Sequence, residues 1–299
     1  HAEPMTIDFQ EGYSLMNPRP QGLDLPYHIM AHEVAHQWWG FFLSPAAVEG
    51  AGLLVESLAT YSAMQVVEET LGYEHLLRYL SQMRLEYEVP RSRAAPPLLR
   101  ANNAFMNYRK GPFALFALRN YIGKDRVNNA LRQMLRNYTP SPPLPTTLDF
   151  YRELQAVTPD SLHYLVHDLF AANTFWELKT ERTTAKQTKA GTWQVTLEVE
   201  TRKLTVDSVG IERNIPMNDW IEIGVYAPRT EGEPSAKVLY LQKHRIGSGR
   251  QTITVTVPGK PARAGIDPQN LLIDLDPENN SKKVVEGLNE KPPGAIKTK

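Results

Sequence analysis

The spacing of apolar residues changes near residue 175, and this change constrains the fold more than any other feature. Before it, apolar residues recur at helical intervals, and Gly72 and Gly123 stand where helices commonly end. The predicted helices cover residues 26–40, 51–71, 74–87, 113–122, 126–138 and 161–172. The first part of the chain is therefore predicted to be mostly helical.

After residue 175 the apolar period becomes two. Trp193, Val195, Leu197 and Val199 alternate with polar residues, and residues 253–257 alternate with threonines in the same way. Further strands are predicted at residues 221–226 and 238–241. Short alternating strands separated by turns, over about 100 residues, are typical of an antiparallel β-sandwich.

The length of 299 residues fits two domains, at roughly 100 to 200 residues each. We expect an α+β multidomain protein with a mostly helical domain over residues 1–175 and a β-sandwich over residues 176–280. Residues 281–299 are polar and rich in Pro, Gly and Lys, so we expect a flexible tail. Helical pattern resumes after the proline-rich stretches 89–99 and 140–145, which are therefore read as loops.

Composition narrows the functional classes. The 33 basic residues balance the 33 acidic ones, which argues against a nucleic-acid surface. No apolar run reaches the 18 residues of a membrane helix. The absence of cysteine excludes disulfides, thiolate metal sites and a cysteine nucleophile, and it leaves the compartment open. A metal site must therefore use Asp, Glu and some of the eight histidines.

Residues 32–36 read His-Glu-Val-Ala-His within a predicted helix. Positions i and i+4 share one helix face, so His32 and His36 can reach the same metal ion. Glu33 flanks that face, where it can contact a water bound to the metal. This arrangement is typical of zinc hydrolases, in which the metal lowers the pKa of water toward about 7 and the carboxylate takes the proton.

His163 and His167 have the same spacing and serve as an internal comparison. Tyr164 follows the first of them, so no carboxylate stands in the position of Glu33. We interpret this second pair as structural.

A catalytic zinc site uses three protein ligands and leaves one position open. The next predicted helix and its approach offer Glu49, Glu56, Glu68 and Glu69. Glu56 alone interrupts an otherwise apolar face, where an unpaired carboxylate would be costly. We therefore predict Glu56 as the third ligand.

These residues resemble the aminopeptidase-N-like gluzincin zinc metallopeptidases. The matching string runs from His32 to Gly40, His-Glu-Val-Ala-His-Gln-Trp-Trp-Gly, and continues at Glu56-Ser57-Leu58-Ala59. The connection between these strings is one residue longer than is usual in that family, and Ser57 stands where the family has glycine. The resemblance implies a thermolysin-like catalytic domain, one zinc ion, peptide substrates and Glu33 as general base.

Two further positions are compared with the family. Asn107-Tyr108-Arg109-Lys110-Gly111 matches a motif whose tyrosine hydrogen-bonds the oxyanion, which implies a catalytic role for Tyr108. The family binds the substrate amine through a glutamate in a Gly-x-Met-Glu-Asn string, which this chain lacks. Glu11 occupies roughly that place, and it is either the amine-binding group or a carboxylate of a surface turn.

The resemblance is to a bacterial branch in which the peptidase follows membrane helices in a permease-like polypeptide. The family's large N-terminal β domain and C-terminal helical domain are missing from this sequence, which begins His1-Ala2-Glu3-Pro4 without an initiator Met. We therefore expect a fragment of a longer protein that is associated with a membrane through its N-terminal region.

Three functions remain open at this stage. The first is a zinc aminopeptidase, the second an endopeptidase of the same fold, and the third a non-catalytic peptidase-like binding module of a transporter. In the sandwich region, Asp274 and Asp276 are read either as solvated turn residues or as calcium ligands.

Overall fold

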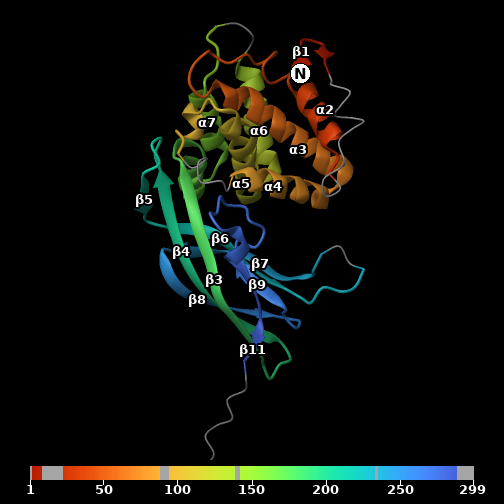
Figure 1. Cartoon of the computed structure of the whole chain (residues 1–299), viewed down its shortest axis with the longest axis vertical. Helices are drawn as coiled ribbons and strands as arrows, with labels where there is room; N and C mark the ends of the chain where they lie inside the picture. Colours follow the sequence, from red (N-terminus) through yellow and green to blue (C-terminus); the bar gives the residue numbers. More distant parts are fainter. Residues whose placement is uncertain (1, 9–22, 88–93, 139–141, 233–234, 288–299) are drawn as a thin grey trace, which may run out of the picture. The chain divides into compact units, whose positions relative to one another are not determined.

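The computed structural model describes residues 2–8, 23–87, 94–138, 142–232 and 235–287. The chain forms two compact units. One comprises His1–Thr174 with Thr205–Arg213, and the other comprises Phe175–Leu204 with Asn214–Lys299. Helices dominate the first unit and strands the second, which agrees with the predicted α+β class (Figure 1).

The first unit is built from helices around an apolar centre. They are α2 (Leu25–Ala35), α3 (Leu58–Leu71), α4 (Tyr73–Tyr87), α5 (Gly111–Ile122), α6 (Lys124–Asn137), α7 (Thr147–Val157) and α8 (His163–Val166). Residues Gly111 to Arg119 of α5 are all buried, so this helix is the core element. Helix α2 packs against α3, and α3 packs against α4 and α5.

Helix α2 ends at Ala35, five residues before the end predicted from the sequence. The chain continues in turns, with backbone hydrogen bonds from Gln37 to Val34 and from Trp38 to Ala35. Gly40 then adopts a φ of 116°, a conformation that glycine tolerates and other residues rarely adopt. This early end leaves the Trp39 carbonyl oxygen free to accept a hydrogen bond from a side chain.

Helix α7 was not predicted. Its N-terminus has a capping box, in which the Thr146 side chain accepts from the Asp149 backbone and the Asp149 carboxylate accepts from Thr146. The Thr-x-x-Asp pattern just after a proline-rich stretch is the sequence signal of this helix start. Phe150 and Leu154, four residues apart, are fully buried and anchor α7.

In the described part of this unit, three π-helical turns interrupt the helices. They are η2 (Leu53–Ser57), η5 (Met106–Lys110) and η7 (His167–Ala171). Single 3-10 turns lie at η4 (Leu98–Arg100) and η6 (Asp160–Leu162). A π-helical turn holds one residue more than an α-helical turn and is frequent at functional sites. Two of the three carry residues predicted for the site, Glu56 and Tyr108.

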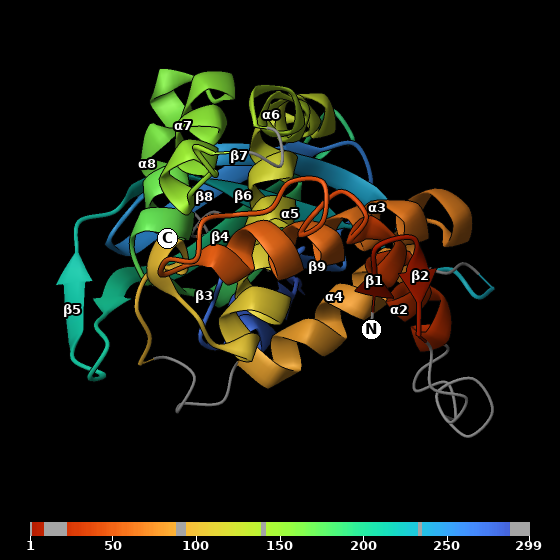
Figure 2. The ribbon, with the colours of Figure 1, turned by 90° about the horizontal axis from the view of Figure 1, so that it is seen from above.

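A short hairpin, β1 (Ala2–Glu3) and β2 (Thr6–Ile7), lies beside α2 (Figure 1, Figure 2). Gln37, which follows His36, holds this hairpin in place through two hydrogen bonds. Its side chain donates to the Glu3 carbonyl oxygen at 3.0 Å and accepts from the Met5 backbone at 2.9 Å. The hairpin thus occupies the rim of the region around the two histidines.

The second unit consists of two sheets. Its strands are β3 (Thr174–Gln187), β4 (Trp193–Val206), β5 (Glu212–Ile215), β6 (Asn218–Tyr226), β7 (Val238–Gly247), β8 (Gly249–Val257), β9 (Arg263–Ile266), β10 (Ser281–Lys283) and β11 (Val285–Glu286). One sheet has the order β10-β9-β6-β7, and the other has the order β11-β3-β4-β5 with β8 paired to β4. The alternation seen in the sequence corresponds to burial, since Val195, Leu197 and Val199 face the interior.

Residues 281–286, assigned to the flexible tail in the sequence analysis, form strands β10 and β11. Strand β10 pairs antiparallel with β9, and β11 pairs parallel with β3. Polar composition alone did not reveal this pairing, because edge strands keep one polar face in water. Residues 288–299 lie outside the described residues.

Asp274 is buried, with 3% of its surface exposed. Its carboxylate accepts hydrogen bonds from the backbone of Leu178 and of Asp276, both at 3.0 Å. These bonds give it a structural role in joining β3 to the following turn.

None of the described helices is long and apolar enough to cross a membrane.

Candidate active site

Helix α2 and its C-cap residue, His36, present three histidines on one face. His28, His32 and His36 are spaced by four residues and are buried, with exposed fractions of 6%, 8% and 9%. This repeat follows the helical period, so the three imidazoles line up along the axis. The two that belong to the predicted motif turn toward η2, whereas His28 has other neighbours.

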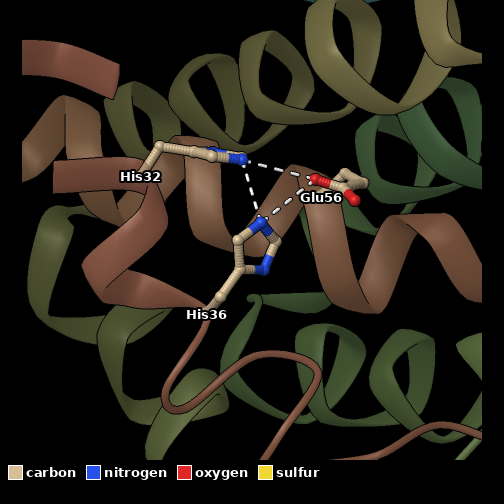
Figure 3. A group of neighbouring side chains, drawn as sticks. All are labelled: His32, His36 and Glu56. Carbon is tan, nitrogen blue, oxygen red and sulfur yellow. Dashed lines mark hydrogen bonds and ion pairs between the residues drawn. The ribbon is translucent and has the colours of Figure 1, made fainter. Parts of the chain in front are cut away.

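His32, His36 and Glu56 converge on one point (Figure 3). The two Nε2 atoms lie 3.0 Å apart, and each lies 3.3 Å from Oε2 of Glu56. Among the described residues, these three form the one group with the geometry of a metal site. Glu56 belongs to the π-helical turn η2, and its carboxylate lies against the two histidines.

The three donor atoms fit a zinc ion. In a tetrahedral site with bonds of about 2.0–2.1 Å, two ligand atoms are separated by about 3.3 Å. The measured separations of 3.0–3.3 Å match this value. Two imidazoles and one carboxylate are also a donor set that catalytic zinc uses, with a fourth position left open.

Neighbouring groups select the tautomer that metal binding requires. Nδ1 of His36 lies 2.9 Å from the Trp39 carbonyl oxygen, which can only accept. Nδ1 of His36 therefore carries a proton, and in the neutral form that binds a metal the lone pair at Nε2 points toward the other two donors. Nδ1 of His32 lies 3.1 Å from Oγ1 of Thr60, which can accept in the same way. Such partners orient metal-binding imidazoles.

Lone pairs directed at one another are unfavourable without a cation between them. Oε2 of Glu56 is buried and makes no hydrogen bond. Burial raises the pKa of the Glu56 carboxyl, but the neighbouring His32, His36 and Tyr108 side chains outweigh this and hold its pKa well below the usual range. The site therefore presents a carboxylate anion and two imidazoles to one point, which is the electrostatic requirement of a divalent metal.

Tyr108 and Glu33 lie at the same site. The Tyr108 ring centroid is 5.7 Å from that of His32, and both Tyr108 and Glu33 line the cavity described below. Burial, together with the Glu56 and Glu33 carboxylates, raises the pKa of the Tyr108 phenol above its usual value. The phenol thus stays protonated near neutral pH and can donate a hydrogen bond.

Close packing between two π-helical turns fixes Tyr108. Oγ of Ser57 in η2 donates to the carbonyl oxygen of Asn107 in η5 at 2.6 Å. A Cβ at Gly111 would lie only 2.0 Å from the same Oγ, so only glycine permits this approach. Lys110 is buried beside them and donates to the Asn173 side chain, and burial lowers its pKa to about 7. The turns that carry Glu56 and Tyr108 are therefore held together.

A cavity of about 1470 Å³ surrounds these groups. Its wall includes the three predicted ligands, Glu33 and Tyr108. Residues of the N-terminal hairpin, including Glu3, and several apolar side chains complete the wall. The mixture of apolar surface with a few convergent polar groups is typical of a substrate site.

The other residues considered in the sequence analysis, Glu11, His163 and His167, are not among the residues described at this site. Glu11 lies outside the described residues. Nε2 of His163 lies 3.0 Å from the carbonyl oxygen of Thr158, and His167 pairs with Asp168. These contacts agree with the structural reading of the second histidine pair.

No family model matches the sequence, and no curated protein matches it significantly. Among solved structures, the chain is similar to a mutant M1 zinc metallopeptidase from Deinococcus radiodurans bound to a Tyr-Ser-Ala substrate. The identity is 20% and the TM-score 0.41, over 48% of this chain and 32% of that chain. A likeness at this level carries no argument, so the function is inferred from the site itself.

Thr60 and the Trp39 carbonyl were not predicted from the sequence as parts of the site. Thr60 stands four residues after Glu56 and thus on the same helix face, a spacing that could have identified it. No sequence pattern could have identified the Trp39 carbonyl as the partner of His36, because its availability depends on where α2 ends.

We predict that Thr60→Val weakens zinc binding by about 10-fold to 100-fold, because His32 loses the acceptor that holds its proton on Nδ1. Competition with a chromophoric chelator measures the dissociation constant. Thr70→Val, at the exposed end of the same helix, is the matched control and should leave zinc affinity unchanged. Equal affinity in Thr60→Val and wild type would contradict the assigned role of Thr60.

Proposed function

We propose that this protein is a zinc-dependent peptidase with a thermolysin-like catalytic domain, and that it acts as an aminopeptidase. The observation that carries the proposal is the convergence of three metal-ligand atoms within 3.3 Å in a cavity that also exposes a carboxylate and a protonated phenol. His32, His36 and Glu56 would hold one zinc ion. Zinc, when bound, supplies a water molecule of lowered pKa and polarises the scissile carbonyl.

Glu33 acts as the general base. It follows His32 on α2, so it flanks the metal ligands without sharing their face. From this position it takes the proton of the attacking water and then passes it to the leaving amine nitrogen. One carboxylate thus serves both halves of the reaction.

Tyr108 stabilises the oxyanion that forms at the scissile carbonyl. Its phenol donates a hydrogen bond, and its raised pKa keeps the proton in place at neutral pH. The packing of η5 against η2 supports this role, because it fixes the phenol relative to Glu56.

The choice between an aminopeptidase and an endopeptidase depends on whether the cavity binds a free amine. Glu11 is the residue proposed for this task from the sequence. Asp8 and Glu3, which precede Glu11 in the sequence, line the cavity, so its wall carries carboxylates besides Glu33 and Glu56. A non-catalytic binding module would not need Glu33 and Tyr108 beside the metal ligands, and their presence favours an enzyme.

We expect Glu33→Gln to retain zinc and to lose hydrolysis of aminoacyl-anilides by about 10²-fold to 10⁴-fold, because the amide cannot take a proton. Metal analysis and steady-state kinetics on the same preparation measure both properties. Glu49→Gln, at an exposed residue paired with Arg100, is the matched control and should keep normal turnover. Normal turnover in Glu33→Gln would refute the mechanism.

A second prediction concerns the substrate amine. If the protein is an aminopeptidase, N-acetylation of a peptide should abolish its cleavage, since the blocked amine carries no charge for a carboxylate to bind. Mass spectrometry of products from acetylated and free forms of one peptide measures this. Cleavage of both forms at internal bonds would identify an endopeptidase instead.

A further inference from the structure

Ser57 and Asn107 are buried polar residues next to two residues of the site, and neither of them lines the cavity. Ser57 follows Glu56 in η2 and is fully buried, whereas Asn107 precedes Tyr108 in η5 and is 8% exposed. The two turns pack against each other, and Oγ of Ser57 donates to the Asn107 carbonyl oxygen at 2.6 Å. This bond therefore connects the residue after one site group with the residue before another.

The side chains of Ser57 and Asn107 each fill the place of a missing Cβ on the opposite segment. A Cβ at Gly111, directly after η5, would lie 2.0 Å from Oγ and 2.6 Å from Cβ of Ser57. A Cβ at Gly52, directly before η2, would lie 2.0 Å from Nδ2 of Asn107. Carbon atoms in favourable contact lie about 3.5–4.0 Å apart, so the two glycines allow an approach that other residues prevent.

This reciprocal fit gives the two turns one favoured separation. A larger separation breaks the Ser57 bond and leaves gaps beside both glycines, and a smaller one brings side chains into backbone. Burial, followed by the Glu56 carboxylate, raises the pKa of the Tyr108 phenol, so the phenol lies close to this metal ligand. The separation of the turns therefore decides where the phenol lies relative to the metal site.

We propose that Ser57 is a positioning residue, whose hydroxyl acts through Asn107 to hold the Tyr108 phenol where the oxyanion forms. The inference rests on the proposed peptidase function and adds a residue to it. A displaced phenol loses a hydrogen bond that is made in the transition state, whereas the three metal ligands and the cavity wall stay in place. The effect of losing the hydroxyl therefore falls on kcat.

The first test is a double-mutant cycle between Ser57 and Tyr108. Ser57→Ala keeps the Cβ against Gly111 and removes only the hydroxyl, while Lys110 still anchors η5 through its bond to the Asn173 side chain. We expect kcat of the zinc-loaded protein for an aminoacyl-anilide to fall about tenfold, with KM and the zinc dissociation constant unchanged. In the Tyr108→Phe background Ser57→Ala should cause no further fall, because the phenol that it positions is gone.

The second test observes the phenol directly and does not depend on turnover. The protein is labelled with 3-fluorotyrosine, and the fluorine NMR signal that is absent from Tyr108→Phe is assigned to Tyr108. We expect this signal to shift or broaden in Ser57→Ala, with and without added zinc, because the ring is no longer held in one place.

Two further variants separate the hydroxyl from packing and from general stability. Thr158→Val is the matched control, because it also removes a buried hydroxyl that donates to a carbonyl oxygen at 2.6 Å, that of Leu154 in α7. It should leave kcat and the Tyr108 signal unchanged. Ser57→Gly combined with Gly111→Ala moves the methyl group from one turn to the other without the hydroxyl, and its kcat should fall as in Ser57→Ala. Thermal unfolding confirms that each variant is folded, and the combined variant replaces Ser57→Ala if that one is not.

The results separate this inference from the proposed function. An unchanged kcat in Ser57→Ala, an equal fall in the Tyr108→Phe background, or an unmoved Tyr108 signal overturns the positioning role. Weaker zinc binding in Ser57→Ala also overturns it, because Ser57 would then act through Glu56, and a normal kcat in the combined variant would assign the effect to packing alone. Absence of hydrolysis by the wild-type protein, with the Tyr108 signal displaced in Ser57→Ala, refutes the peptidase and leaves the control of the phenol by Ser57 standing.

Discussion

The central constraint in this structure is electrostatic. Two imidazole nitrogens and a carboxylate oxygen lie within 3.3 Å of one another in a largely buried site, and a cation satisfies this arrangement. The irregularities of the backbone nearby contribute to this arrangement. Helix α2 ends early, which frees the Trp39 carbonyl for His36, and η2 adds a residue that turns Glu56 inward. The packing of Ser57 against η5 then fixes Tyr108 at the same place.

The site could be predicted in part because its main element is local. The motif His32-Glu33-Val34-Ala35-His36 spans five consecutive residues, so the period of the helix alone predicts how its side chains are arranged. Glu56 was identified because a carboxylate interrupts an apolar face. Thr60 and the Trp39 carbonyl needed the structure, since the first contact joins residues 28 positions apart and the second depends on the end of a helix.

The fold, like the site, could be predicted from the sequence only in part. Segments with a clear apolar period, such as η2 together with α3, helix α6 and the first half of β4, were expected at nearly their observed positions. Helix α7 was missed because its start depends on a capping box that the apolar pattern does not show. Strands β10 and β11 were missed because they are short and polar, and their pairing partners are remote in the sequence.

The most direct test of this account is the metal content of the purified protein. The protein is first incubated with stoichiometric zinc and then exchanged into metal-free buffer, which removes unbound metal. Elemental analysis should then find one zinc ion per chain in the wild type and none in His36→Ala. A His163→Ala variant should keep its zinc, because His163 bonds carbonyl oxygens away from the site. A wild-type protein that retains no zinc, or a His36→Ala variant that retains one ion, would contradict the central claim.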